Sequence, residues 1–154
     1  MDLHIHWCNF EQLDNLRLQS IWALRQQVFI IEQQSIYADI DGVDQRAWHL
    51  LLEQNNQLVG YARLLDDSIH DCYRFQRIVL SEQARGQGLG RILMEQLIEK
   101  ARGAGQYKSL RLSAQVHLQN FYRQWKFVPQ GAEYDDGGIM HIDMQRLQNQ
   151  ELGQ

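Results

Sequence analysis

The amino-acid sequence predicts one α/β domain with a mixed central β-sheet, in the element order β-α-β-β-β-α-β-α-β-β. Segments with the two-residue period of strands alternate with segments whose apolar side chains recur at helical spacing. Near the middle, Ile78, Val79 and Leu80 are apolar in succession, which is typical of a strand covered on both faces. A chain of 154 residues buries enough surface to need no disulfide or metal, so we expect residues 1–154 to form a single domain.

The first half of the chain predicts a strand, a helix and a hairpin. Residues 4–8 alternate polar and apolar side chains and form the strand. Strands 48–53 and 58–65 flank two asparagines that suit a tight turn. Residues 13–32 form the helix, because apolar side chains recur there at helical spacing: Leu13, Leu16, Ile21, Leu24, Val28 and Ile31. The acidic loop after it contains Asp39, Asp41 and Asp44, and we expect it to face water.

The second half of the chain continues with alternating strands and helices. Gly103 and Gly105 are expected to end an amphipathic helix, and Asp136, Gly137 and Gly138 favour a tight turn in a final hairpin. The expected ranges are a central strand over 73–80, a helix over 89–101, a strand over 109–114, a short helix over 116–125, and hairpin strands over 128–134 and 139–146.

Composition argues against several partners. Fifteen Lys and Arg against nineteen Asp and Glu give a net charge of −4, which lacks the basic excess that nucleic-acid binding needs. The first ten residues carry neither a basic segment nor an apolar core of a secretion signal, and no run of apolar residues is long enough to span a membrane. Cys8 and Cys72 are too few for a disulfide framework. We therefore expect a cytoplasmic protein that binds neither nucleic acid nor membrane.

A glycine-rich turn joins the central strand to the amphipathic helix. It reads Arg85-Gly86-Gln87-Gly88-Leu89-Gly90. Glycines let backbone approach a ligand closely, and free amides at a helix start bind phosphate or pyrophosphate. The turn lacks the Gly-Lys-Ser/Thr of a P-loop, and Arg91 stands where a dinucleotide fingerprint needs glycine. The turn therefore predicts another kind of anion site, with a simple helix-capping turn as the alternative.

The sequence resembles the GCN5-related N-acetyltransferases (GNAT), whose coenzyme-A signature is Gln/Arg-x-x-Gly-x-Gly/Ala, matched here by Arg85, Gly88 and Gly90. A second motif of that family, a strand followed by a helix with a tyrosine, is similar to the segment that contains Tyr122. The likeness to the ElaA-type members is closest in Arg25-Gln26-Gln27-Val28-Phe29, Glu32-Gln33, Tyr37, Asp41, Asp44, Leu112-Ser113-Ala114-Gln115 and His141-Ile142-Asp143-Met144. Gln115 stands where an asparagine is usual, and Lys126 replaces the glycine before Phe127.

The resemblance implies the GNAT acyl-CoA N-acyltransferase fold, with a splayed strand pair and acetyl-CoA as cofactor. The pantetheine arm would add to the central strand as an extra strand, the pyrophosphate would lie on the helix amides, and an amide near Val79 would polarise the thioester carbonyl. The implied cofactor-binding residues are Ile78, Val79, Leu80, Arg85, Gly86, Gln87, Gly88, Leu89, Gly90, Arg91, Gln115 and Asn120.

Acetyl transfer to an amine needs a proton donor for the departing thiolate and a base for the amine. The resemblance places Tyr122 as the acid, with simple packing beside Phe121 as the alternative. Glu32 follows an apolar run, so we expect a partly desolvated carboxylate with a raised pKa that serves as base, with capping of a helix end or an ion pair with Arg25 as the alternative. His117 and His141 are rivals because imidazole titrates near neutrality, and a water chain would also serve.

The acceptor is expected to be a small-molecule or peptide amine. The residues expected to line its pocket, where negative charge would attract a cation, are Arg25, Phe29, Tyr37, Asp41, Asp44, Arg63 and His141. A solvated acidic loop is the alternative for the aspartates. His4, His6 and Cys8 share one strand face but are spread too widely for a closed metal site, so we expect no metal.

Two other functions fit parts of the pattern. The N-terminal residues are also similar to acyl-homoserine-lactone synthases, which use longer acyl donors, although this chain is short for that family. A coenzyme-A-binding module without turnover would keep the glycine turn and would not need Tyr122. The predicted activity is acetyl-CoA-dependent N-acetylation by direct attack in a ternary complex, by a monomer or homodimer.

Overall fold

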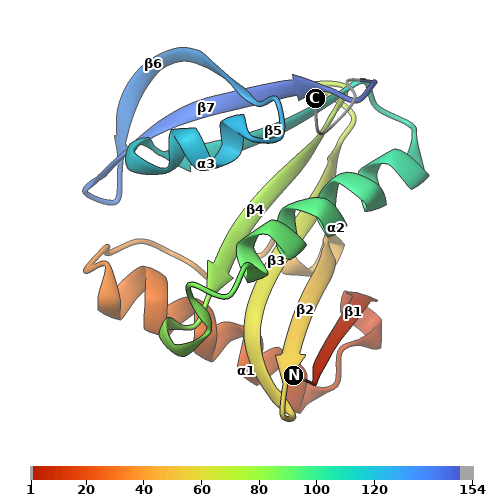
Figure 1. Cartoon of the computed structure of the whole chain (residues 1–154), viewed down its shortest axis with the longest axis vertical. Helices are drawn as coiled ribbons and strands as arrows, with labels where there is room; N and C mark the ends of the chain where they lie inside the picture. The colour runs from red at the N-terminus through yellow and green to blue at the C-terminus, as the bar shows by residue number, and fades with distance from the viewer. Residues whose placement is uncertain (1, 150–154) are drawn as a thin grey trace.

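The computed structural model describes residues 2–149, whose strands form one seven-stranded sheet in the order β1-β2-β3-β4-β5-β7-β6 (Figure 1). The strands are β1 (Leu3–Asn9), β2 (Trp48–Gln54), β3 (Gln57–Asp67), β4 (Cys72–Leu80), β5 (Ser109–Gln115), β6 (Val128–Asp136) and β7 (Ile139–Leu147). Neighbouring strands are antiparallel except β4 and β5, which run parallel. The central place expected for the strand with the unbroken apolar run is confirmed.

Turn chemistry explains two of the hairpins. Asn55 and Asn56 between β2 and β3 have φ of 51° and 62°, and Gly137 and Gly138 between β6 and β7 have φ of 64° and 84°. Two successive residues with positive φ give the turn whose twist matches that of paired strands, and asparagine and glycine tolerate it best. Both predicted hairpins are therefore confirmed.

The α-helices are α1 (Asn15–Arg25), α2 (Leu89–Ala104) and α3 (Gln119–Arg123), and short 3-10 turns span Phe10–Gln12, Asp44–Arg46, Glu82–Ala84 and Val116–Leu118. The prediction of one α-helix over residues 13–32 is wrong, because α1 ends at Arg25 and a π-helical segment (Gln26–Glu32) follows. Over only seven residues, the spacing of apolar side chains does not distinguish an α-helix from a π-helix. α2 runs through Gly103 and ends before Gly105, whose left-handed φ of 62° caps it.

Helices cover both faces of the sheet, α2 on one face and α1 on the other (Figure 1). Successive side chains of β2 point to opposite faces of the sheet. Leu50 and Leu52 pack in the core with α2, whereas Leu51 packs with Ile21 of α1. Leu16 and Ile31 do not join this face and are 75% and 53% exposed, so the buried stripe is narrower than the sequence predicts. No helix within residues 2–149 is long and apolar enough to cross a membrane.

The parallel pair β4 and β5 opens along its length. Cys72 to Phe75 pair with Ser109 to Leu112, and beyond them β4 stays with β3 while β5 stays with β7. At the point of divergence β4 carries one extra residue relative to β3, and Arg77 there has a φ of 56°. The predicted splayed strand pair is confirmed, and within residues 2–149 it leaves one edge of the last part of β4 without a strand partner.

Candidate active site

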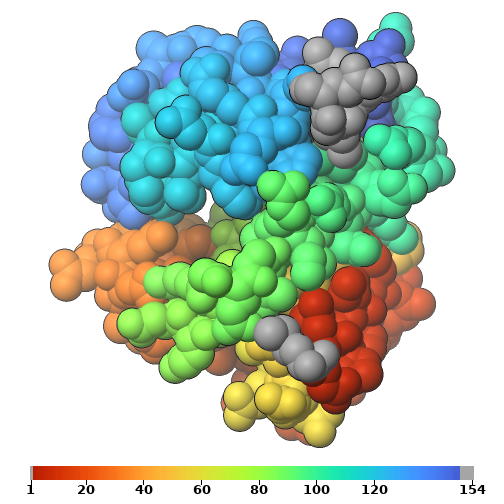
Figure 2. Space-filling model, viewed as in Figure 1, coloured from red at the N-terminus to blue at the C-terminus, as the bar shows by residue number. Residues whose placement is uncertain are grey.

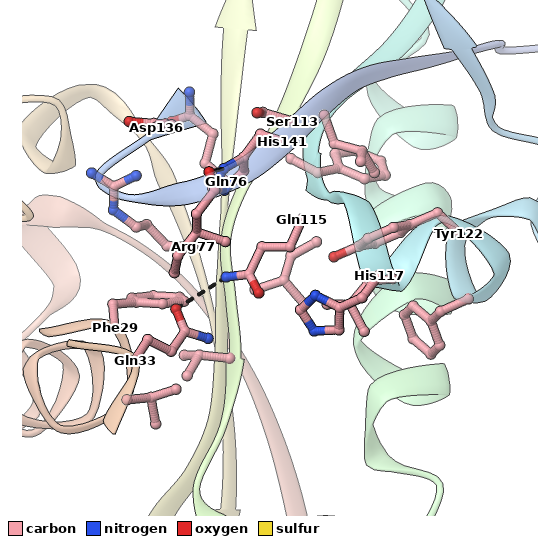
Figure 3. Close-up of a pocket in the computed structure, with 18 of the residues that line it drawn as sticks. Phe29, Gln33, Gln76, Arg77, Ser113, Gln115, His117, Tyr122, Asp136 and His141 are labelled. Atoms are coloured by element: carbon pink, nitrogen blue, oxygen red, sulfur yellow. Dashed lines mark hydrogen bonds between the residues drawn. The ribbon is translucent and has the colours of Figure 1, made fainter. Parts of the chain in front are cut away.

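A cavity of about 670 Å³ lies where β4 and β5 diverge. Its size is in the range of pockets that bind small molecules, roughly 300–1,000 Å³. Figure 2 shows a hollow between the C-terminal part of the chain, in cyan and blue, and the orange segment after α1. Figure 3 shows residues from both sides of this opening pointing toward one another. The cavity therefore combines the end of β4, the start of α2, α3 and the β6–β7 hairpin in one site.

The glycine-rich turn leads into this cavity at the start of α2. Gly86 and Gly88 have φ of 77° and 79°, a left-handed conformation that other residues rarely adopt. A Cβ on Gly90 would lie 3.2 Å from Cζ of Phe121, so a larger residue there requires the Phe121 ring to shift by a few tenths of an ångström. The first amides of α2 have no acceptor within the helix and are available to an anion.

The predicted cofactor-binding residues divide into two groups. Arg85, Gly90 and Gln115 line the cavity itself, together with Ile78, Val79 and Leu80. The rest lie outside its wall, namely Gly86, Gln87, Gly88, Leu89, Arg91 and the exposed Asn120. For the turn residues this position suits a phosphate outside the cavity mouth, whereas nothing in the geometry brings Asn120 to the cavity.

The open edge of β4 belongs to Ile78 and Leu80. The Ser81 amide donates to the Val59 carbonyl of β3 at 2.8 Å. Because successive residues of a strand direct their backbone groups to opposite sides, Val79 also faces β3, and Ile78 and Leu80 face the cavity. Arg85 Nη2 donates to the Leu80 carbonyl at 3.2 Å from that side. The amide near Val79 that is expected to meet a thioester would therefore belong to Ile78 or Leu80, and this expectation stays a prediction.

Tyr122 lies on α3 with its hydroxyl directed into the cavity (Figure 3). The side chain is only 7% exposed, and the structure gives its hydroxyl no hydrogen-bond partner among residues 2–149. Burial raises the pKa of this phenol to about 12. The group is therefore a protonated, unpartnered donor throughout the neutral range.

Glu32 does not have the environment predicted for a desolvated base. Its side chain is 36% exposed, and its two carboxylate oxygens accept from Arg85 at 2.8 and 3.1 Å. An apolar run precedes it in the sequence, but the π-helical segment turns the carboxylate toward the glycine-rich turn. Glu32 thus lies at the end of the cavity formed by the glycine-rich turn.

The two histidines differ in how they are held. His117 is exposed at the cavity wall beside Gln115 and Tyr122 (Figure 3). His141 Nδ1 donates to the Ile139 carbonyl at 2.7 Å, which requires the proton on Nδ1. In the neutral ring Nε2 then carries the lone pair, so the hydrogen bond fixes which nitrogen of His141 can accept a proton at the cavity wall.

Four predicted acceptor-binding residues form an ion-pair network instead of a pocket, and all of them except Asp41 are buried. Arg25 is 0% exposed and pairs with Asp39 at 2.9 Å and Asp44 at 2.8 Å. Arg63 pairs with Asp44 at 2.9 Å and Asp41 at 2.6 Å. Burial opposes ionisation of Asp41, but hydrogen bonds from Arg63 and the Val43 amide prevail and hold its pKa at about 2.

The acidic loop therefore does not offer negative charge to an amine. The four residues of this network lie outside the cavity wall, and both of its acids are paired with arginine from neighbouring elements. The expectation that the loop faces water is wrong for Asp39 and Asp44, which are 8% and 4% exposed. Of the predicted acceptor-binding residues, Phe29, Tyr37 and His141 do line the cavity.

Several cavity residues were not predicted as site residues from the sequence. Gln33 is one of them and accepts from Gln115, which was predicted, at 3.0 Å across the opening (Figure 3). Ser35 is another and donates to the Gly137 carbonyl at 2.7 Å. On the β5–β7 wall, Ser113 is hydrogen-bonded to the Tyr134 hydroxyl, which donates to Asp143 at 2.7 Å. The signal in the sequence is a polar residue at every second position of these strands, such as Arg111, Ser113 and Gln115.

The diverging parallel strands and the glycine-rich helix start define the acyl-CoA N-acyltransferase fold. The chain matches the family described as acetyltransferase (GNAT) domain over residues 13–148 and belongs to that family. Protein ElaA of Escherichia coli K12 is 38% identical over 149 residues, 94% of each chain. Its crystal structure covers 94% of this chain and 99% of that chain, with 34% identity and a TM-score of 0.88.

Two other solved structures are also similar to this chain. An acyl-CoA N-acyltransferase from Pseudomonas aeruginosa is 36% identical with a TM-score of 0.89, over 94% of this chain and 99% of that chain. The AHL synthase LasI, at 17% identity and a TM-score of 0.75 over 96% of this chain and 91% of that chain, shares the fold alone. The predicted fold class and the ElaA-like grouping are thereby confirmed.

Proposed function

We propose that this protein is an acetyl-CoA-dependent N-acetyltransferase that transfers acetyl to a primary amine of a small molecule or peptide by direct attack. The observation that carries the proposal is the unpartnered hydroxyl of Tyr122, 7% exposed and directed into the cavity between β4 and β5. The hydroxyl is open to the cavity and is not engaged with another residue among 2–149, so a ligand in the cavity can accept its hydrogen bond. A coenzyme-A-binding module without turnover would have no need of that group.

The residues present fit acetyl-CoA. The open backbone of Ile78 and Leu80 would pair with the amides of the pantetheine arm, as an added strand does. The first amides of α2 would hold the pyrophosphate, and the cavity mouth has Arg85 beside it. When bound, acetyl-CoA supplies the acetyl group as an activated thioester.

Tyr122 would act mainly as a hydrogen-bond donor to the departing sulfur. A phenol with a pKa of about 12 is a weaker acid than a thiol with a pKa of roughly 8.5, so full proton transfer to the thiolate is unfavourable. A short hydrogen bond to a charged acceptor still stabilises the thiolate as it forms. Tyr122 therefore favours breakage of the carbon–sulfur bond without losing its proton.

His141 is the proposed base for the amine, with a water chain as the means of transfer where direct contact is lacking. Its Nδ1 is bound to the Ile139 carbonyl, so Nε2 accepts the proton that the attacking nitrogen loses. Glu32 is engaged with Arg85, and His117 is exposed and has no comparable orienting contact among residues 2–149. We assign Glu32 to the cofactor end and keep His117 as the comparison variant.

The test is release of free thiol from acetyl-CoA in the presence of polyamines, amino acids, aminoglycosides and peptide amines. Amine-dependent release that is slowed by Tyr122→Phe and His141→Gln, and much less by His117→Gln, supports the proposal. Tight binding of acetyl-CoA without release under any amine would refute turnover. Preference for long acyl donors over acetyl would instead favour the acyl-homoserine-lactone-synthase-like activity.

We also propose that residues 1–154 act as one domain in the cytoplasm, as a monomer or homodimer. Cys8 and Cys72 are buried free thiols, as expected in a reducing compartment. Light scattering of the purified protein decides between one and two copies, and limited proteolysis that releases a stable fragment would contradict a single domain.

A further inference from the structure

Two arginines stand side by side on one wall of the cavity. Arg74 of β4 and Arg111 of β5 are direct neighbours in the parallel register of these strands, and both line the cavity. Adjacent strands are only about 4.8 Å apart, and like charges placed opposite each other are unfavourable. Such a pair is expected to be compensated by negative charge.

The protein itself compensates only one of the two. Arg74 Nε pairs with Asp67 at 2.7 Å. Arg111 forms no ion pair within residues 2–149, and its hydrogen bond to the His70 carbonyl is long at 3.4 Å. Its Nε is buried and has no partner among these residues. A buried guanidinium nitrogen without an acceptor costs free energy that a bound anion would recover.

The other arginines of the cavity wall are neutralised, which sets Arg111 apart. Arg77 pairs with Asp39 at 2.7 Å and Asp41 at 3.2 Å, and Arg85 pairs with Glu32 at 2.8 Å. The unmatched positive charge of the wall is therefore concentrated at Arg111. A planar guanidinium fork matches the two oxygens of a carboxylate.

Negative charge lies two residues further along the same wall. Ser113 is paired in register with Asp143, whose carboxylate accepts from Tyr134, and Asp136 lines the cavity nearby. Figure 3 shows Asp136, Ser113 and His141 around one end of the cavity. Two strand residues span about 7 Å, so a positive and a negative subsite follow each other at that spacing.

We propose that the acceptor is an amine that also carries a carboxylate several bonds away, bound by Arg111, rather than a polyamine. This inference rests on the N-acetyltransferase function proposed above. The amine of such an acceptor lies at the Asp143 and His141 end, and its carboxylate lies against the Arg111 guanidinium, which lines the cavity. Amino acids with a distal amine and short peptides belong to this class.

Three amines of one chain length test the inference: 6-aminohexanoate, pentylamine and 1,5-diaminopentane, which end in a carboxylate, a methyl group and an ammonium. We expect kcat/KM of the wild-type protein to fall in that order, with at least a tenfold drop from the first to the second, as loss of a charged hydrogen bond predicts. Arg111→Gln should abolish the preference by lowering kcat/KM for 6-aminohexanoate alone. Arg111→Lys should retain part of it, because charge without the planar fork binds less well.

Arg102→Gln is the matched control, since Arg102 is an exposed arginine of α2 that pairs with Glu99. It should leave all three values unchanged. The inference is overturned if pentylamine serves as well as 6-aminohexanoate, or if Arg111→Gln lowers all three equally while the protein stays folded. If the wild-type protein acetylates no amine of this series or of the wider panel, the proposed function fails and the inference falls with it.

Discussion

Removal of the Tyr122 hydroxyl is expected to slow acetyl transfer and leave stability almost unchanged. The hydroxyl has no protein partner, so Tyr122→Phe breaks no hydrogen bond among residues 2–149 and keeps the ring that packs beside Phe121. We expect the free energy of unfolding to change by less than about 1 kcal/mol. A hydrogen bond to the charged thiolate is worth about 1.5–3 kcal/mol, and each 1.4 kcal/mol is about tenfold in rate. The expected loss in kcat is therefore about 10- to 150-fold.

The assay combines thiol release, calorimetric binding of acetyl-CoA and a thermal melt. Tyr73→Phe is the matched control, because the Tyr73 hydroxyl accepts from the Gln106 amide at 3.0 Å and lies outside the cavity wall. That variant should lose about 1 kcal/mol of stability and keep its kcat. Since burial raises the pKa of Tyr122 to about 12, the wild type and Tyr122→Phe should give parallel pH profiles up to about pH 10. A Tyr122→Phe variant with kcat within threefold of wild type would refute the role.

Three further predictions concern the cofactor end and the ion-pair network. Glu32→Gln should tighten acetyl-CoA binding, measured by calorimetry, because it frees Arg85 and removes a negative charge near the proposed phosphate site. The gain should be several-fold at low salt and smaller at high salt. A tenfold loss of kcat with unchanged affinity would instead make Glu32 the base. Gly90→Val should weaken acetyl-CoA binding at least tenfold by displacing Phe121. The control is Gly103→Ala, because a Cβ at Gly103 would meet no atom within 4 Å. This control should only stabilise α2, by up to about 1 kcal/mol. Asp44→Asn should cost about 3–5 kcal/mol in a thermal or denaturant melt, because it leaves two buried arginines short of a carboxylate. Burial opposes ionisation of Asp44 but the arginines prevail and lower its pKa, so its contribution should be complete above about pH 4 and be lost as the pH falls below that value. If Asp44→Asn instead left the stability unchanged and raised the KM for the acceptor, Asp44 would be an acceptor-binding residue.

The parts of the fold that could be predicted are those set by local chemistry. Asn55 and Asn56 specify a turn with positive φ, and the apolar run ending at Leu80 specifies a central strand, whatever surrounds them. The end of α1 could not be predicted, because the change from α-helical to π-helical hydrogen bonding after Arg25 alters the spacing of apolar residues too little to be read.

In the candidate site, too, the features set by local sequence could be predicted and those set by tertiary packing could not. The glycine-rich turn and Tyr122 lie in short contiguous motifs, and both are at the cavity. The placement of the aspartates was wrong, because a loop sequence does not show which arginines will pack against it. Arg111, Ser113 and Asp143 went unrecognised because a polar residue at every second position of a strand is also the pattern of a face open to water.

The buried ion pairs act on the site through the backbone of β4. Arg77, at the residue where β4 gains its bulge and leaves β5, holds a φ of 56°, which is unfavourable for a side chain of this kind. Its guanidinium is fixed by Asp39 and Asp41 and lies 5.3 Å from the centre of the Tyr37 ring. Those two aspartates are in turn held by Arg25 and Arg63. The network thus holds the strained residue at the point where β4 leaves β5, which links residues outside the pocket to the geometry of its wall.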